Sequence, residues 1–282
     1  MKRFLLALGA ATVLAGCQTT GVKLDKTYTS ENQDSRVLFL VMHYTVGDFD
    51  SSLKMLTQAK HGQVSSHYLV SESPVRTYQL VDESRRAWHA GPSFWKGHAQ
   101  LNASSVGIEI VNRGWVKQPD GSIQYTPFPE EQIAEVVALS TEIVKRHNIR
   151  PERIVGHGEI QPRSKQDPGP LFPWKRLHEA GLIAWPDEAV VAAKKAEFEL
   201  LMPDVKWVQD RLAQHGFAAA STGELDAYTR DCLAAFQMRY RPAKYDGQID
   251  AETAALLHAV TTPEAMKMKA PPPATKPYTS RW

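Results

Sequence analysis

One short apolar run constrains the fold more than any other feature of the sequence. Residues 36–42 read Arg-Val-Leu-Phe-Leu-Val-Met, with an apolar side chain at every position after the first. Such a run is typical of a central strand that is covered on both faces. Further strand candidates lie at residues 66–70, 75–80, 106–111 and 153–155, separated by helical or irregular segments. This order favours α/β layering.

The clearest predicted helix spans residues 130–147. Ile133, Val136, Ser140 and Ile143 recur at helical spacing, acidic residues fill the first turn, and basic residues fill the last. Acids at the start and bases at the end of a helix both stabilise its dipole. A shorter helix is predicted at residues 173–182.

The C-terminal third reads as a linker followed by a small helical unit. Residues 184–202 are rich in Ala, Lys and Glu and predict a linker. Residues 203–262 predict three short helices: one beginning near Val205, one at residues 226–240, and one at residues 250–260 with Asp250 as N-cap. They would form a three-helix bundle. Residues 263–282 are rich in Pro and Lys and predict a disordered tail.

The N-terminus has the pattern of an export signal. Lys2 and Arg3 precede an apolar run, residues 4–13, that is too short to span a bilayer as a helix. The following Leu-Ala-Gly-Cys17 resembles the bacterial lipobox, which implies a lipoprotein signal peptide at residues 1–16, a lipid on Cys17 and a tether at residues 17–35. Gln18 after the cysteine resembles the pattern for sorting to the outer membrane, facing the periplasm. The alternative is an ordinary signal peptide with an incidental cysteine.

Charge and cysteine content limit the possible partners. The 33 basic and 31 acidic side chains leave a net charge of +2, so nothing global favours nucleic acid as a partner. The two cysteines are Cys17 and Cys232. With Cys17 lipidated, we expect no structural disulfide and a buried Cys232.

Three polar residues have settings that suit a metal. His43 ends the first apolar strand, His157 lies between two glycines after residues 153–155, and Asp167 lies in a proline-rich turn. Two imidazoles and one carboxylate form a three-ligand set for zinc that leaves one position for water. The spacing alone does not decide, because histidines satisfied in a core or loop would give the same pattern.

Six motifs in a fixed order resemble one enzyme family. They are Val-Met-His43-Tyr-Thr, Val-Ser-Ser-His67-Tyr, Trp-His89-Ala-Gly, Asn102-Ala-Ser-Ser-Val-Gly-Ile-Glu109-Ile, Val-Gly-His157 and Lys165-Gln-Asp167-Pro-Gly-Pro. Their order is similar to that in the zinc-dependent N-acetylmuramoyl-L-alanine amidases, whose superfamily includes the peptidoglycan recognition proteins. The resemblance implies an amidase domain at residues 36–183 with a mixed central sheet flanked by helices. Together with the lipobox it points to an outer-membrane lipoprotein of this family.

The family's roles carry over to matching positions. The resemblance implies that His43, His157 and Asp167 hold Zn²⁺, that Glu109 is the catalytic acid and base, and that Lys165 stabilises the transition state. The implied reaction cuts the amide between N-acetylmuramic acid and L-alanine during cell-wall turnover. Without the resemblance, Glu109 could be a solvent-facing strand carboxylate and Lys165 a solvated loop lysine.

Other motif residues have weaker assignments. Some family members place a tyrosine where this chain has Ser66, which shifts the acid–base work to Glu109. His67 is expected to be structural. His89 and Asn102 are candidate substrate-binding residues, with a purely structural role as the alternative. Aromatic residues that could pack on sugar or peptide, or simply in the core, are Trp88, Phe94 and Trp95.

The C-terminal unit resembles a three-helix peptidoglycan-binding domain. The similar residues include Phe236-Gln237, the turn Asp246-Gly247 and Glu252-Thr253. Its apolar positions are equally consistent with a stabilising bundle that has no ligand. Two rival functions remain for the whole chain: a module that binds peptidoglycan or its muropeptide fragments without cutting, and a zinc peptidase that cuts within the stem peptide.

Overall fold

The computed structural model describes residues 22–270, and the chain divides into two units, residues 1–34 and 35–282. In the first unit, residues 22–34 form no helix or strand. The predicted signal peptide and Cys17 lie outside the described residues. Within residues 22–270, no helix combines the length and apolar character needed to span a bilayer.

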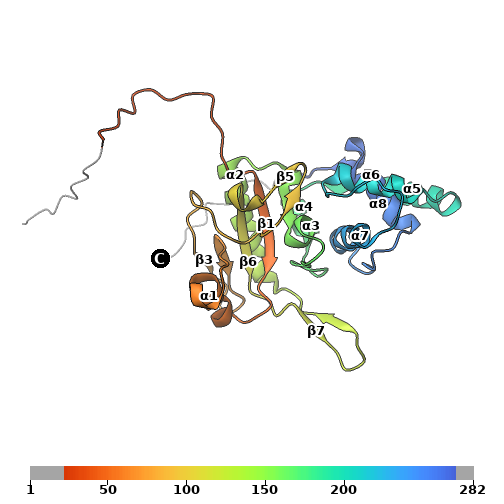
Figure 1. The fold of residues 1–282 in the computed structure, drawn as a ribbon, viewed down its shortest axis with the longest axis horizontal. Coiled ribbons are helices and arrows are strands. Elements are labelled where there is room, and N and C mark those ends of the chain that lie inside the picture. The colour runs from red at the N-terminus through yellow and green to blue at the C-terminus, as the bar shows by residue number, and fades with distance from the viewer. Residues whose placement is uncertain (1–21, 271–282) are drawn as a thin grey trace, which may run out of the picture. The chain divides into compact units, whose positions relative to one another are not determined.

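A five-stranded mixed sheet forms the centre of the second unit, in the order β3-β2-β6-β1-β9 (Figure 1). Four of its strands are parallel and β3 pairs antiparallel at one edge. All six residues of β1 are buried, as expected for the first apolar run, although the strand begins at Phe39. The strands are β1 (Phe39–Tyr44), β2 (Tyr68–Val70), β3 (Thr77–Gln79), β6 (Ser105–Ile110) and β9 (Ile154–Gly156). The predicted mixed α/β sheet is confirmed.

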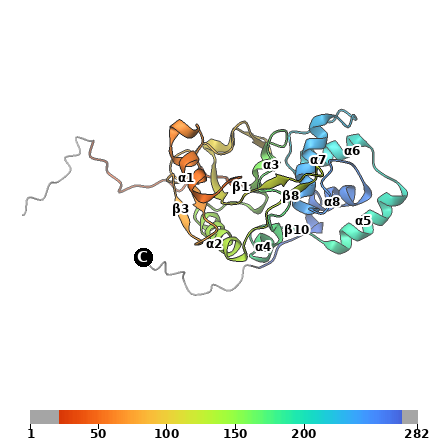
Figure 2. The same cartoon turned by 90° about the horizontal axis from the view of Figure 1, so that it is seen from below.

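Two helices cover opposite faces of this sheet: α1 (Phe49–Thr57) and α2 (Glu130–His147) (Figure 2). Helix α2 has the predicted bounds. The Gln132 side chain at its start donates hydrogen bonds to the carbonyls of Val70 (3.2 Å) and Val111 (2.8 Å), which fixes α2 against the ends of two strands. Helix α1 was not predicted, and Leu56 on it packs against Leu69 of β2.

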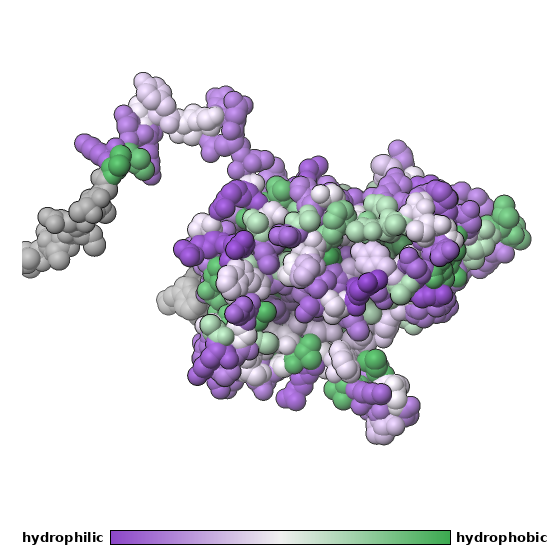
Figure 3. Space-filling view, viewed as in Figure 1, coloured by the Kyte–Doolittle hydropathy of each residue, from purple (hydrophilic) through white to green (hydrophobic). Residues whose placement is uncertain are grey.

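Short elements connect these layers. The β7–β8 hairpin projects from the domain (Figures 1 and 3), and its exposed apolar side chains include Val116 and Ile123. The helix predicted at residues 173–182 is present but shorter, as α4 (Trp174–Glu179). These elements are η1 (Ala59–His61), β4 (Phe94–Trp95), β5 (His98–Ala99), η2 (Leu101–Ala103), β7 (Trp115–Lys117), β8 (Ile123–Tyr125), η3 (Pro151–Arg153), α3 (His157–Ile160) and α4 (Trp174–Glu179).

Three capped helices form the C-terminal bundle: α6 (Val205–His215), α7 (Ala227–Tyr240) and α8 (Ala251–Val260). Asp204, Asp226 and Asp250 each accept a hydrogen bond from the backbone N–H three residues later, as N-caps do. The predicted linker contains α5 (Glu188–Leu200), which packs along α8 (Figure 2). Cys232 is buried within the bundle.

The prediction of disorder from residue 263 is wrong for the first part of the tail. Residues 263–265 form η4 (Pro263–Ala265), and β11 (Met266–Lys267) pairs antiparallel with β10 (Trp185–Pro186). Burial of Ala265 and this backbone pairing outweigh the polar composition. Residues 271–282 lie outside the described part of the chain.

Candidate metal centre

Strand register brings three of the predicted site residues together. In the parallel pairing of β1 with β6, His43 lies opposite Glu109, and in that of β1 with β9, Met42 lies opposite Gly156. His157 follows Gly156 directly and therefore lies beside His43. Residues in register on parallel strands point to the same face, and the carboxyl ends of such strands are where α/β folds place their sites.

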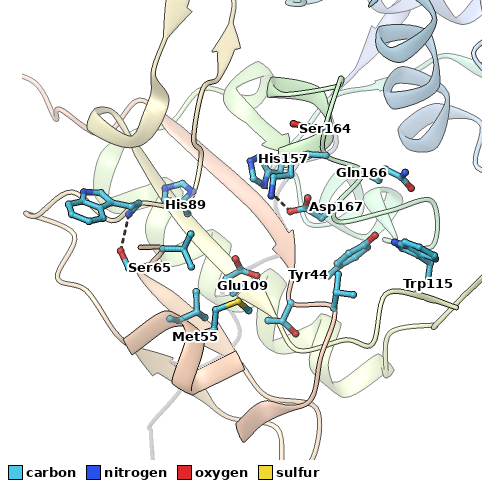
Figure 4. A pocket seen from close by; sticks show the side chains of 16 residues that line it. Tyr44, Met55, Ser65, His89, Glu109, Trp115, His157, Ser164, Gln166 and Asp167 are labelled. Atoms are coloured by element: carbon cyan, nitrogen blue, oxygen red, sulfur yellow. Dashed lines mark hydrogen bonds and ion pairs between the residues drawn. The ribbon is translucent and has the colours of Figure 1, made fainter. Parts of the chain in front are cut away.

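The three predicted metal ligands converge on one point, and Figure 4 shows two of them, His157 and Asp167, pointing toward each other. Nδ1 of His43 lies 3.0 Å from Nδ1 of His157 and 2.9 Å from Oδ2 of Asp167, and the last two atoms lie 3.1 Å apart. All three residues are buried, and each offers one atom to a common centre. Asp167 comes from the loop after α3, which the Asp167 carbonyl fixes by accepting from the Gly158 N–H (2.8 Å).

A chain of hydrogen bonds sets the tautomer of His43. The Ser105 hydroxyl donates to the Leu101 carbonyl (2.6 Å), so its oxygen is free to accept from Nε2–H of His89 (3.1 Å). Nδ1 of His89 is then an acceptor for Nε2–H of His43, 2.9 Å away. The neutral His43 ring therefore has no proton on Nδ1, and that lone pair faces His157 and Asp167.

His157 has the same arrangement. Its Nε2–H donates a hydrogen bond to Oε1 of Gln161, 3.2 Å away, so the neutral ring has no proton on Nδ1. Two bare nitrogen lone pairs and a carboxylate oxygen at about 3 Å repel one another unless a cation lies between them. The donor set also suits zinc, which binds imidazole nitrogen and carboxylate oxygen. The residues present therefore fit a metal ion.

Electrostatics keep these ligands in the forms that bind metal. Burial and the neighbouring His157 lower the pKa of His43 to about 4. Burial would raise the pKa of Asp167, but the two imidazoles beside it outweigh burial and hold that pKa below its ordinary range. Around neutral pH the site thus presents uncharged His43 and an ionised carboxylate, the states that metal binding requires.

Glu109 lies on the same face of the sheet, next to this centre (Figure 4). Its Oε2 is buried and has no hydrogen-bond partner among the described residues. Burial, reinforced by the charge of Asp167 and opposed by Lys165, raises the pKa of Glu109 to about 8. A carboxyl group whose pKa lies near neutrality can both take up and release a proton, as an acid–base catalyst must.

The site opens into a cavity of about 430 Å³ lined by His89, Glu109, His157, Lys165 and Asp167. Its rim carries two half-exposed indoles, Trp88 (49%) and Trp115 (43%). The Trp115 side chain comes from the projecting β7–β8 hairpin. A cavity of this size, with a few converging polar groups and apolar walls, is typical of a small-ligand site.

The glycines around His157 make room for the loop, not directly for a ligand. A Cβ on Gly156 would lie 2.7 Å from the Pro168 ring, and one on Gly158 would lie 3.2 Å from the Lys165 carbonyl. The close approach of the Lys165–Pro168 segment is what brings Asp167 to the two histidines. Lys165 itself is exposed at the cavity wall.

Other predicted residues have mainly structural contacts. Oδ1 of Asn102 accepts from the backbone N–H groups of His89 (3.0 Å) and Ala90 (2.7 Å), so Asn102 fixes the segment that carries His89. His67 is fully buried, and its Nδ1 accepts from the Gly107 N–H (3.1 Å). Trp95 is a core residue, 1% exposed. The substrate contacts predicted for His89 and Asn102 stay predictions.

Sequence reasoning missed three residues of the site: Ser105, Gln161 and Trp115. Ser105 lies inside a motif used for the resemblance, and Gln161 follows His157 by one helical turn, so both positions carried a signal. Trp115 lies in a segment whose Pro119-Asp120-Gly121 turn could have indicated a hairpin.

Comparisons with known proteins match three segments of the chain to known families. Residues 33–170 match the family described as N-acetylmuramoyl-L-alanine amidase, residues 202–257 match a peptidoglycan binding domain, and residues 1–18 match a prokaryotic membrane lipoprotein lipid attachment site. The amidase AmpD of Enterobacter cloacae is 36% identical over 36% of this chain and 48% of its own length.

Similarity to two other proteins extends over most of the chain. N-acetylmuramoyl-L-alanine amidase AmiD of Escherichia coli is 40% identical over 92% of this chain and 98% of its own length. Its solved structure superimposes with a TM-score of 0.75 over 85% of this chain and 94% of that chain. AmpDh3 of Pseudomonas aeruginosa, 37% identical, gives a TM-score of 0.77 over 85% and 98%. The chain therefore belongs to the N-acetylmuramoyl-L-alanine amidase family.

Proposed function

We propose that this amidase hydrolyses the amide between N-acetylmuramic acid and L-alanine of peptidoglycan, with a zinc ion held by His43, His157 and Asp167. One observation carries the proposal: two imidazoles with bare Nδ1 atoms and one ionised carboxylate meet at about 3 Å beside Glu109, whose buried Oε2 has no hydrogen-bond partner within residues 22–270. Zinc at this position would supply the Lewis acidity that makes water a nucleophile near neutral pH.

The proton transfers fall to Glu109. As a carboxylate it takes a proton from the attacking water, and as the acid it delivers that proton to the leaving amino group of L-alanine. Its raised pKa, about 8, keeps both forms accessible near neutral pH. Among the described residues, the other carboxyl group that lines the cavity is Asp167, which would be engaged by the metal.

Lys165 supplies positive charge at the cavity wall. Attack on the lactyl carbonyl places a negative charge on its oxygen, and an ammonium aimed at that oxygen stabilises the transition state more than the neutral substrate. Lys165 is near enough to lower the pKa values of both His43 and Glu109, so its charge reaches the reacting atoms.

The substrate class follows from the relatives. E. coli AmiD has been solved with anhydro-N-acetylmuramic acid-L-Ala-D-γ-Glu-L-Lys, and AmpDh3 with an anhydromuramic pentapeptide. The 430 Å³ cavity suits a muramyl-L-alanine unit, with the remaining stem peptide and glycan lying along the rim. His89, which lines the cavity, could then contact substrate as well as His43.

The remaining parts of the chain would hold the enzyme near its substrate. Residues 1–16 would be the signal peptide, lipid on Cys17 would anchor the chain to the outer membrane facing the periplasm, and residues 17–35 would be the tether. The amidase domain would be residues 36–183, with the linker at 184–202 and the bundle at 203–262, which would bind peptidoglycan. Replacing Cys17 with alanine should release the protein from the membrane fraction.

The test is mass spectrometry of products from purified peptidoglycan sacculi. With zinc, the wild-type protein should release stem peptides that have free L-alanine amino ends. His43→Ala should lose bound zinc and the product, whereas His61→Ala, which changes an exposed histidine, should retain both. Cuts inside the stem peptide would identify a peptidase. A protein without zinc or product would be a binder.

A further inference from the structure

A buried ion pair joins the C-terminal bundle to the turn that presents His157. Nη1 of Arg239, on α7, lies 2.8 Å from Oε2 of Glu159, on α3. The two side chains are 6% and 4% exposed. Glu159 lies two residues after His157, so the pair lies directly behind a proposed metal ligand.

The guanidinium holds this turn from both sides. The same Nη1 donates to the carbonyl of Ile154 (3.1 Å), which begins β9. Oε2 of Glu159 also accepts from the N–H of Gly156 (2.8 Å). Arg239 therefore bonds directly to the start of β9 and, through Glu159, to Gly156, the residue just before His157. The Trp174 ring, 4.1 Å from the guanidinium carbon, covers the guanidinium face.

Apolar contacts also hold the bundle against the amidase domain. The Trp95 ring packs against Phe217 (5.1 Å between centroids) and so closely on Gly216 that a Cβ there would lie 2.6 Å from it. Burying two charges is an inefficient way to stabilise a junction that already has apolar contacts, because desolvation offsets most of the attraction. The directional bonds of the pair instead fix backbone geometry.

We propose that Arg239 is a positioning residue of the catalytic centre, which holds the β9–α3 turn so that Nδ1 of His157 faces the metal. The inference rests on the proposed function, since it takes His157 as a ligand. It makes the C-terminal bundle a part of the catalytic machinery in addition to any role in binding peptidoglycan. Removing Arg239 should then impair metal binding even with a substrate too small to engage the bundle.

The test uses the full chain and measures zinc affinity by competition with a chelating dye, beside kcat and KM on a soluble anhydro-muramyl tripeptide. We expect Arg239→Met to weaken zinc binding by about 10- to 100-fold, the range for residues that orient metal ligands. It should also reduce kcat by a larger factor than it changes KM. Arg163→Met is the matched control. It removes an exposed arginine whose Nε lies 3.9 Å from Oδ2 of Asp231 on α7. This variant should leave zinc affinity, kcat and KM unchanged.

A double variant covers the case in which Arg239→Met does not fold. Arg239→Met with Glu159→Gln removes both charges, and exchange of a buried ion pair for uncharged side chains is often tolerated. If positioning is the role, zinc affinity stays low in the double variant. Wild-type zinc affinity and kcat in either folded variant would overturn the inference. Failure of the wild-type protein to bind zinc or cut the tripeptide would instead refute the proposed function.

Discussion

Replacing Glu109 with glutamine should greatly slow catalysis and at the same time stabilise the metal-free protein. The carboxylate is poorly solvated, since its Oε2 is buried and has no hydrogen-bond partner in the part of the chain that the structure describes, and its pKa is raised from 4.5 to about 8. A carboxyl group whose pKa is higher in the folded state than in the unfolded state ionises less readily in the folded protein. Ionisation of that group therefore favours unfolding. The destabilisation is therefore absent below pH 4.5, grows as the pH rises toward 8, and is constant above it.

The magnitude follows from the pKa difference. At pH 7 this pKa difference favours the unfolded state by about 3 kcal/mol, and at pH 5 by about 1 kcal/mol. Because Glu109 reaches water in the cleft, solvent screening reduces these values, and we expect a measured difference of about 1 kcal/mol between the two pH values. Glutamine has nearly the same volume and no charge, so it removes this destabilisation.

The assay is urea unfolding of metal-free wild-type and Glu109→Gln proteins at pH 5 and pH 7. The stability gained by the variant should increase with pH, and zinc should reduce the gain because the cation favours the ionised form of Glu109. Glu142→Gln is the matched control, since Glu142 lies on the solvent side of α2. A gain that is equal at both pH values, or absent, would refute the burial argument. Amidase activity of the variant should fall by about 10²- to 10⁴-fold.

Three further substitutions test other parts of the site and fold. Lys165→Ala should lower kcat by about 10²-fold without loss of zinc, and Lys175→Ala, exposed on α4, should have no effect in the same steady-state assay. His89→Phe removes the acceptor for Nε2–H of His43 and should weaken zinc binding by about 10- to 100-fold in a chelator competition, with partial rescue by His89→Asn, which restores an acceptor. Trp95→Ala should cost about 3–5 kcal/mol in urea unfolding, because it empties a 1%-exposed core position, and a cost below 1 kcal/mol would contradict that role.

Elements with strong local signals could be predicted from the sequence. Helix α2 has the predicted bounds because its apolar period, its acidic first turn and its basic last turn all agree. Asp250 caps α8 as expected. Helix α1 was not predicted although Asp48 caps it and Phe49, Leu53 and Leu56 recur at helical spacing, so the sequence carried a signal for this nine-residue helix that was overlooked. Residues 263–267 were missed because their order comes from pairing with β10, a contact distant in sequence.

The role of Glu109 could not be read from strand alternation alone. A glutamate between two isoleucines shows that β6 has one apolar face and one face that carries a carboxyl group. It does not show what covers the face with the carboxyl group. In the structure the face that carries Glu109 looks into the cleft beside α1, so the side chain is neither in the core nor fully in solvent. A fully solvated Glu109 was a reasonable alternative only because α1, which borders this cleft, was not predicted.

The six motifs resemble a family in order because each one builds a different side of one site. Two of the proposed ligands, His157 and Asp167, lie 114 and 124 residues after His43, so no local spacing could reveal the full set. The residues around the ligands explain the rest of each motif. Ser105 sets the tautomer of His89, and Gly107 leaves space for the same ring, since a Cβ there would lie 2.5 Å from it. Such a motif contains the residues whose hydrogen bonds and packing position a metal-binding side chain. Substitution of the metal-binding residue alone would leave most of the motif intact. Metal binding by each variant, measured directly, is therefore the property that separates a working amidase from a protein that retains only the motifs.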